Sequence, residues 1–415
     1  MKRCGKRISR FTGCAAGILA FLLCLTACAR VEEEPEPVKA TLDLWYYWDA
    51  PVVRQTLLAM ISKFNNTHSD VEIVATCVPD EDFKKTLALA IADGNMPDLA
   101  IVDSSDVQYY NHMKRLTDVS SCMDEQKYLD QAMTSCRQAD GSIIGLPMGV
   151  NFLAFYYNTD ILERNHVKPP TNLREFVDVA HQTTSDTVYG CAFPSLQSEE
   201  STFCFLPILW ASGGSLDAIN TEGAKQSFDF LRQLSRDGSM SHSTINMTIS
   251  DIMKEFTKGN LAMMFINSGQ ESKIKQDNPE LQFEVAALPM GEHPVTVLGG
   301  EVLTVMSSDQ QGEAKEFVRF MAEPEQIKGY LDALGYLAPR EDLLEWQVGQ
   351  HPEQRKYLDY LQSAQMREFT PYWPAVSMAV ADVINQVILQ EDEPDALEKL
   401  DEKIRKIREE YDEGK

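Results

Sequence analysis

The fold of this 415-residue chain is decided by the stretch at residues 145–158, which reads GLPMGVNFLAFYYN. Glycine and proline at its start favour a turn, and a continuous apolar and aromatic run follows. Such a run is typical of a buried strand. We interpret the stretch as a crossing between two lobes, although an ordinary strand after a tight turn is also compatible with it. Because small-molecule sites favour interfaces between domains, a crossing would place a ligand site beside it.

Strand and helix patterns alternate on both sides of this stretch. Before it, strand-like runs at 42–48, 71–75 and 99–102 are separated by segments with apolar residues at helical spacing. After it the alternation resumes, and it ends in an amphipathic helix that Pro394 opens. The alternation predicts an α/β fold with parallel strands and helices on the faces of the sheets.

The N-terminus is typical of a leader rather than of a folded segment. A basic segment precedes an apolar segment at 15–25 that is too short to span a bilayer as a mature helix. Leu25-Thr26-Ala27-Cys28 then resembles the cleavage site of a bacterial lipoprotein signal. We predict that residues 1–27 are removed, that Cys28 is lipidated, and that residues 28–40 hold this cysteine and a tether. A secretory signal followed by a chance cysteine is the alternative.

The charge of the chain excludes some partners. The net charge is −25, and removal of the five basic residues of the leader brings it to −30. Nucleic-acid binding needs a basic surface, so this acidic chain is not expected to bind nucleic acid. The same charge argues against binding of anionic lipid by the folded surface, which leaves the lipid anchor as the membrane contact.

Five cysteines remain beyond Cys28, an odd number that does not allow a complete set of disulfides. Cys122–Cys136 and Cys191–Cys204 are possible local bridges, and free thiols are equally compatible with the sequence. No C-x-x-C pair is present, so we expect no zinc ribbon and no metal site.

Several segments, in order, resemble the extracellular solute-binding protein family 1, the sugar-binding lipoproteins of bacterial ABC importers. The similarity runs from about residue 42 to residue 408. The segments are 44–48 (LWYYW) with the helix that ends at 65, 92–99 (ADGNMPDL), 145–158, 209–214 (LWASGG), 256–263 (FTKGNLAM), 297–301 (VLGGE) and 314–340.

The resemblance implies a two-lobed fold of the periplasmic-binding-protein type II class, with a ligand cleft between lobes that a multi-crossing hinge joins. We assign residues 41–150 and about 285–320 to lobe 1, and residues 151–284 and about 321–415 to lobe 2. It also implies a monomer, lipid-anchored on the extracytoplasmic face of the cell membrane. That monomer would capture a mono- or oligosaccharide and deliver it to ABC permease subunits, without a cofactor.

A site for a neutral sugar needs aromatic platforms for its apolar faces and planar polar groups for its hydroxyls. Tyr47 and Trp48 end the first strand, where open α/β sheets bind ligands, although core packing is the alternative for both. Asp103 ends the third strand and could accept bonds from vicinal hydroxyls or cap a helix. Asn151 lies in the crossing stretch, where the family often places a polar ligand contact.

Further candidates come from the other segments of the resemblance. Trp210 and Gly214 lie in a turn that stacks on ligand or belongs to the core of the second lobe, and Gly300 before Glu301 would let the backbone approach the ligand. The family often has a tryptophan shortly after the segment at 256–263, and here Asn267 and Gln270 supply hydrogen bonds in its place. The last candidates are Arg340, as a ligand clamp or an ion pair at the hinge, and Trp373, as a lid aromatic.

Two other functions are compatible with the same fold. A sugar sensor or adhesin would bind in the same way, and only its partners would distinguish it. A glycoside-acting enzyme would need two opposed carboxylates, and no local arrangement nominates a pair. The chain also has no G-x-S-x-G elbow and no phosphate-binding loop of the G-x-x-x-x-G-K-[ST] type, so we expect no catalytic residues.

Overall fold

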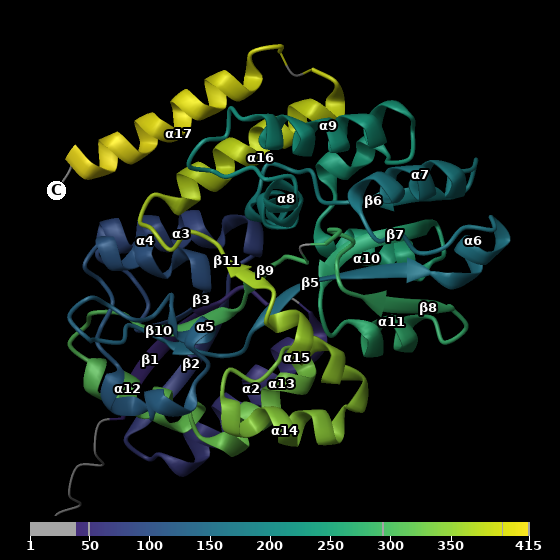
Figure 1. The fold of residues 1–415 in the computed structure, drawn as a ribbon. Helices are drawn as coiled ribbons and strands as arrows, with labels where there is room; N and C mark the ends of the chain where they lie inside the picture. Colours follow the sequence, from purple (N-terminus) through teal and green to yellow (C-terminus); the bar gives the residue numbers. More distant parts are fainter. Residues whose placement is uncertain (1–38, 49, 293, 392, 414–415) are drawn as a thin grey trace, which may run out of the picture.

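The computed structural model describes residues 39–413 except residues 49, 293 and 392. Two mixed sheets, each with helices packed on it, form two lobes that lie side by side (Figure 1). The leader and Cys28 lie outside the described residues.

The first sheet has the strand order β2-β1-β3-β10-β4. Its strands are β1 (Ala40–Tyr46), β2 (Val71–Cys77), β3 (Leu99–Asp103), β4 (Leu146–Pro147) and β10 (Glu301–Val305). β1 runs parallel to β2 and β3, and β10 runs antiparallel to β3 and β4. The expected parallel order therefore holds for β1, β2 and β3, and a returning segment completes the sheet.

Helices from both halves of the sequence surround the first sheet. They are α2 (Pro51–Thr67), α3 (Asp80–Asp93), α4 (Val107–His112), α5 (Asp130–Met133), α12 (Gln311–Met321), α13 (Pro324–Leu334) and α14 (Glu341–Gln350). In α2, proline at the first position presets the helical φ angle. Leu57, Met60, Ile61 and Phe64 then follow at helical spacing and are all buried in the core of this lobe.

The second sheet has the strand order β11-β9-β5-β7-β6, and β8 also pairs with β5. Its strands are β5 (Asn151–Asn158), β6 (Tyr189–Ala192), β7 (Leu261–Asn267), β8 (Phe283–Ala286), β9 (Thr296–Gly299) and β11 (Ala364–Met366). Every residue of β5 is buried, as its apolar sequence predicts. Alternate side chains of β5 enter two different cores, one on each face of the sheet.

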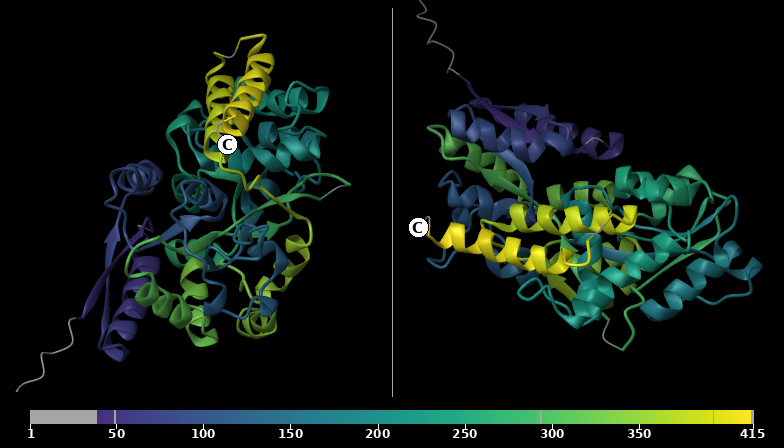
Figure 2. Two further views of the ribbon diagram at one scale, coloured as in Figure 1. Left: turned by 90° about the vertical axis from the view of Figure 1, so that its left-hand side faces the viewer. Right: turned by 90° about the horizontal axis from the view of Figure 1, so that it is seen from above.

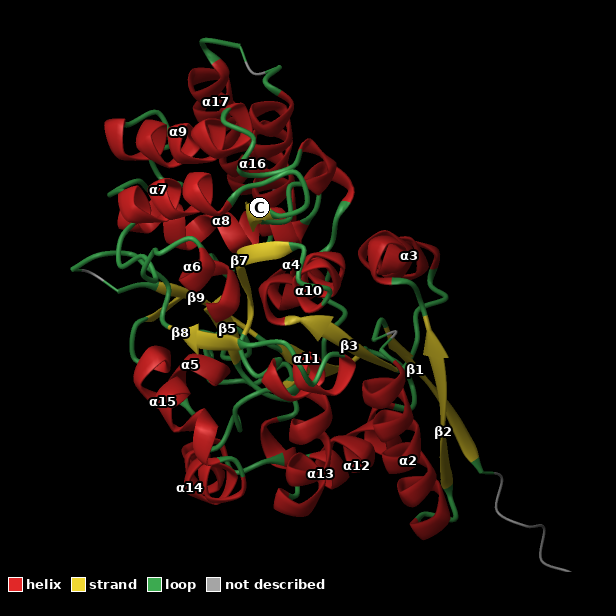
Figure 3. Ribbon diagram, turned by 90° about the vertical axis from the view of Figure 1, so that its right-hand side faces the viewer, coloured by secondary structure: helices red, strands yellow, loops and turns green. Residues whose placement is uncertain are grey.

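Helices cover both faces of the second sheet (Figure 3). They are α6 (Thr159–Arg164), α7 (Leu173–Thr183), α8 (Glu199–Ala211), α9 (Glu222–Arg236), α10 (Ile249–Thr257), α11 (Glu271–Asp277), α15 (Arg355–Leu361), α16 (Trp373–Leu389) and α17 (Ala396–Glu413). Short 3₁₀ turns are η1 (Ser104–Asp106), η2 (Ser120–Cys122), η3 (Glu125–Lys127), η4 (His242–Asn246) and η5 (Pro352–Gln354). The predicted C-terminal helix is confirmed as α17, which packs through Leu400 and Ile404.

The chain passes between the lobes at three places. The first passage joins β4 to β5, within the stretch that the sequence indicated. The second joins β9 to β10 at Gly300, because β8 and β9 pair within the second sheet. The third follows α13 and α14, because α12 and α13 pack into the core of the first lobe. The structure thus places the return to lobe 1 later than the boundary near residue 285, and the last departure later than residue 320.

Gly300 sits where the first two passages touch. Its φ angle is +144°, a region that favours glycine, and a Cβ atom added there would lie 2.4 Å from the carbonyl oxygen of Gly149. Only a residue without a side chain lets these two backbone segments approach each other in this way.

We predict that Gly300→Ala destabilises the protein, because the added methyl group would force the two passages apart. Overpacking of this kind typically costs about 1–3 kcal/mol. The control is Gly312→Ala in α12, where an added Cβ meets nothing within 4 Å and a gain of about 0.4–1 kcal/mol is expected. Urea unfolding of both variants measures the difference, and equal stabilities would contradict this account of the crossing.

Candidate functional site

Two carboxylates face each other across neighbouring strands at the edge of the first lobe. Asp103 ends β3 and Glu301 begins β10, and the two residues are register partners in the antiparallel pair. Asp103 also accepts hydrogen bonds from the backbone N–H and hydroxyl of Ser105, at 2.7 Å each, so it caps η1 as well.

Arg367 links this edge to the second lobe. It directly follows β11, and its side chain is only 1% exposed. Its guanidinium lies 2.9 Å from Asp103 in the first lobe and 2.8 Å from Glu199, which begins α8 in the second. A single buried cation therefore holds a carboxylate from each lobe.

The second-lobe side of this contact is built around Glu199. Its Oε1 accepts a hydrogen bond from the Trp373 indole at 3.1 Å, and its Oε2 accepts one from the hydroxyl of Ser377. One turn further along α8, the ring of Phe203 lies 5.0 Å from the Arg367 guanidinium.

The first-lobe side is built around Glu301. Its Oε1 accepts hydrogen bonds from the hydroxyls of Tyr336, at 2.8 Å, and Tyr47, at 3.3 Å. A hydrogen bond from Asn151 lowers the pKa of Tyr336, although burial and the Glu301 charge together raise that pKa well above its usual value. Asn151 thus lies against Tyr336.

Asn151 and Phe203 connect the Glu301 side of the contact to the Arg367 side, because both lie against Gly299. A Cβ added to Gly299 would meet the Asn151 Oδ1 at 2.3 Å and the Phe203 ring at 3.2 Å. β5 and β9, which carry Asn151 and Gly299, lie near the centre of Figure 1, and α8, which carries Phe203, lies above them. We call the following residues the interlobe ring: Asp103, Asn151, Glu199, Phe203, Glu301, Tyr336 and Arg367.

Three polar atoms of the interlobe ring have no hydrogen-bond partner within the described part of the chain. They are Nε of Arg367, Oδ1 of Asn151 and Oε2 of Glu301, and all three atoms are buried. These residues are 3%, 5% and 8% exposed, respectively. A buried polar atom without a partner costs free energy, so each such atom calls for a partner that the chain does not supply.

Burial and charge shift the pKa values of the carboxylates in opposite directions. Burial, and then the charge of Asp103, raise the pKa of Glu301 to about 7, against the opposing effect of the Tyr336, Trp48 and Tyr47 side chains. Burial would also raise the pKa of Asp103, but the charge of Arg367 and the Ser105 hydrogen bonds lower it below its usual value. Glu301 therefore titrates near neutral pH while Asp103 stays ionised.

Several predicted candidates lie in or against the interlobe ring. Asp103, Asn151 and Glu301 are members, Tyr47 bonds to Glu301, and Gly300 precedes Glu301. Trp373 touches Glu199 but is itself fully buried, at 0% exposure, which differs from the exposed position expected of a lid.

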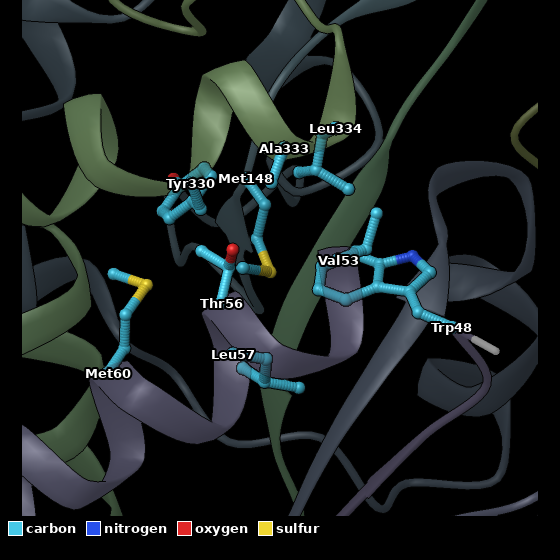
Figure 4. A pocket seen from close by; sticks show the side chains of 9 residues that line it. All are labelled: Trp48, Val53, Thr56, Leu57, Met60, Met148, Tyr330, Ala333 and Leu334. Atoms are coloured by element: carbon cyan, nitrogen blue, oxygen red, sulfur yellow. The ribbon is translucent and has the colours of Figure 1, made fainter. Parts of the chain in front are cut away.

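Trp48 is shared between the interlobe ring and the core. Its indole lies near enough to Glu301 to lower the pKa of that carboxyl, although the indole N–H has no hydrogen-bond partner within the described residues. The same ring lines a narrow apolar gap against α2 that has no room for a water molecule, with Val53, Leu57 and Met148 around it (Figure 4). This packing fits the alternative that Trp48 is a core aromatic.

Four candidates lie outside the interlobe ring. Trp210 lies at the C-terminal end of α8, roughly 16 Å along the helix from Glu199, and Gly214 packs against Leu209. The backbone carbonyl of Asn267 accepts a hydrogen bond from Tyr156 at 3.2 Å, and its buried side-chain oxygen has no partner within the described residues. Arg340 forms a two-bond ion pair with Asp342, at 2.7 and 2.9 Å, inside the first lobe.

The sequence interpretation missed four members of the interlobe ring, which are Glu199, Phe203, Tyr336 and Arg367. Arg367 follows a three-residue strand that gave no clear pattern, and Glu199 stands among polar residues at a helix start, where an acid is expected on dipole grounds alone. Tyr336 belongs to the segment at 314–340, from which only Arg340 was selected. An aromatic residue directly after the helix-ending Gly335 was the available signal.

Cysteines and metals play no part in this geometry. The five described cysteines are free, and burial raises the pKa of the Cys136 thiol to about 12. Residues 39–413, apart from the three gaps, contain no group of three or more His, Cys, Asp or Glu side chains that could hold a metal ion. Over the same residues, no helix is long and apolar enough to cross a membrane.

Relatives in sequence include sugar-binding proteins. The melibiose/raffinose/stachyose-binding protein MelE of Bacillus subtilis is 22% identical over 334 residues, which cover 75% of this chain and 77% of MelE. A binding protein of Brucella abortus is 23% identical over 272 residues, and the match spans 62% of this chain and 66% of that relative.

Solved structures show the same architecture. The cyclic α-maltosyl-1,6-maltose-binding protein of Arthrobacter globiformis superposes with a TM-score of 0.71 at 24% identity, over 89% of this chain and 99% of that one. An ABC transporter solute-binding protein of Thermotoga lettingae, bound to α-D-tagatose, gives a TM-score of 0.80 at 19% identity, over 89% and 100%. These similarities confirm the two-lobed α/β fold.

The family model for bacterial extracellular solute-binding proteins matches residues 59–355. The matched segment includes both sheets except β1 and β11, and the first two passages between the lobes. Because the match covers more than half of the chain, the protein belongs to the bacterial extracellular solute-binding proteins.

Proposed function

We propose that this protein is the substrate-binding component of an ABC importer and that it captures a carbohydrate at the interlobe ring. The proposal keeps the predicted capture function and the candidates Tyr47, Asp103, Asn151 and Glu301, and it assigns capture to the contact between β3, β10, α8 and the segment after β11.

The observation that carries the proposal is the set of three unpartnered atoms in the interlobe ring. Arg367 Nε is a donor, and Asn151 Oδ1 and Glu301 Oε2 are acceptors. A sugar hydroxyl both donates and accepts hydrogen bonds, so neighbouring hydroxyls on one ring can satisfy these atoms. Phe203 lies beside Arg367 and Tyr47 bonds to Glu301, and both rings offer apolar faces for the C–H groups of a sugar.

The relatives support carbohydrate as the ligand class. MelE is named for melibiose, raffinose and stachyose, and the structures with the same fold include proteins named for cyclic maltosyl-maltose or bound to tagatose. The family and these structures are binding proteins, which agrees with the absence of a nominated catalytic pair in the sequence.

We further propose that the lobes open and close around the ring by a hinge motion at the three passages. Arg367 contacts Asp103 in one lobe and Glu199 in the other, so opening must break at least one of these ion pairs. A ligand that bonds to the same groups would replace the lost contacts. Thermal-shift screening of the protein with mono- and oligosaccharides tests capture, and small-angle scattering with a hit tests compaction. If no carbohydrate stabilises the protein, this function is wrong.

We also propose that Cys28 anchors the protein by lipid on the extracytoplasmic face, as a monomer that docks on permease subunits. The support is the leader at 1–27 and the extracellular character of the family.

We predict that Tyr336→Phe weakens carbohydrate binding about tenfold while the protein stays folded. The change removes one hydroxyl from the interlobe ring, and a hydrogen bond to a charged group contributes about 1.5–3 kcal/mol. Tyr189→Phe, at a half-exposed position on β6, is the matched control and should bind as the parent does. Calorimetric titration measures both, and equal affinities would remove Tyr336 from the site.

We predict that Glu301 makes the protein less stable as pH rises from about 4.5 to about 7. Its folded pKa, about 7, lies above the ordinary value of 4.5, so its contribution is fully present below pH 4.5 and is lost as the pH rises through 7. The difference between parent and Glu301→Gln should change by on the order of 3 kcal/mol over this window. Urea unfolding at pH 4.5 and 7.5 measures it, and a constant difference between the two proteins would show that Glu301 does not titrate there.

We predict that Cys28→Ala moves the protein from the membrane fraction to the soluble fraction, because the lipid anchor is lost. Cys77→Ala, which changes an exposed cysteine of the folded part, should leave the protein on the membrane. Immunoblots of washed membranes compare the two, and retention of the Cys28→Ala variant would disprove the anchor.

A further inference from the structure

We propose that the interlobe ring selects a carbohydrate that carries a protonated amine. This inference rests on the proposed function and adds the charge class of the ligand. It follows from the balance of charges at the ring, from the partners that each charge already has, and from the acceptor left open beside Glu301.

The ring and its immediate surroundings hold more acids than bases. The acids are Asp103, Asp106, Glu199 and Glu301, and the bases are Lys84 and Arg367, a net of two negative charges when all are ionised. The protein as a whole carries a charge of −25, which attracts cations at long range.

Both cations are already paired with carboxylates. Lys84 lies 2.8 Å from Asp106, and Arg367 contacts both Asp103 and Glu199. An anionic sugar would therefore have to displace a carboxylate from one of these cations. That exchange gains little, because it replaces one buried ion pair by another and leaves a carboxylate unpaired.

Glu301, in contrast, is surrounded by neutral donors. The groups that face it are Tyr47 at the end of β1, Trp48 after it, Tyr336 after α13 and the carboxylate of Asp103 on β3. The nearest charge is thus a like charge, which together with burial raises the pKa of Glu301 to about 7. A ligand cation would remove this repulsion, and a ligand anion would increase it.

One unpartnered acceptor atom, Asn151 Oδ1, belongs to a side chain that lies close to Glu301. The hydroxyl of Tyr336 donates to Glu301, and the Asn151 side chain lies against Tyr336, with its Oδ1 unpartnered. An ammonium group has three donors and no acceptor. It can therefore bond to Asn151 and Glu301 together, which a single hydroxyl, with one donor, cannot do.

The test compares matched sugars that differ only in charge. The protein is titrated calorimetrically at pH 7 with glucosamine and glucose, galactosamine and galactose, mannosamine and mannose, and with the corresponding uronic acids. We expect at least one amino sugar to bind tenfold or more tightly than its neutral partner, and the uronic acids to bind most weakly. Neutral sugars that bind as tightly as their amino partners would overturn the inference and leave the proposed function intact.

A second measurement detects the proton that Glu301 releases when the ligand binds. Glu301 is partly protonated at pH 7, and an ammonium ligand should lower its pKa, so binding should release part of a proton. The measured heat of binding should then change with the ionisation enthalpy of the buffer for the amino sugar and not for its neutral partner. Glu301→Gln should abolish both the proton release and the preference, and Glu280→Gln at an exposed position should keep both. A preference that survives Glu301→Gln would overturn the assignment. Failure of every sugar, charged or neutral, would overturn the proposed function itself.

Discussion

The contact on which the two-lobed arrangement depends is the double ion pair of Arg367. Taking a guanidinium out of water is costly, and the cost is offset only when it has good partners. Its partners come from different lobes, Asp103 from β3 and Glu199 from α8, so the buried charge is satisfied only while the lobes touch. Phe203 lies beside the guanidinium, and Glu301 stands opposite Asp103 in the sheet.

A second contact between the lobes lies on the same side of the molecule. The end of α17 reaches over the first lobe, as the two views of Figure 2 show, and the ring of Tyr411 lies 5.7 Å from His112 in α4. Arg408 on α17 pairs with Glu368, the residue after Arg367, at 2.7 Å. The C-terminal helix is therefore tied to the segment that carries the central cation, and a hinge motion that separates Arg367 from Asp103 must also displace Tyr411 from His112.

Sequence patterns predicted those parts of the site that belong to regular strands. The apolar run at 151–158 and the strand ending at Asp103 placed two ring residues, because the end of a strand in an α/β sheet is a defined position. Arg367 and Glu199 were not predictable in this way, since each is placed by a contact with residues more than 160 positions away. The turn at Gly213–Gly214 stays a prediction as a ligand contact. An added Cβ at Gly214 would lie 2.4 Å from Leu209, so close packing is sufficient to account for that glycine.

The partners of each ring atom distinguish a site from a structural polar network. A purely structural network would be expected to satisfy all its buried groups, because a partly satisfied network is less stable than an apolar core. Here Asp103 and Glu199 are well satisfied, whereas Arg367 Nε, Asn151 Oδ1 and Glu301 Oε2 are not. Asn151 begins β5 after the first passage between the lobes, Glu301 begins β10 after the second, and Arg367 follows β11 within the second lobe. A ligand that bonds to these atoms would bind best when those segments are together, and its binding energy would favour the closed arrangement over the open one.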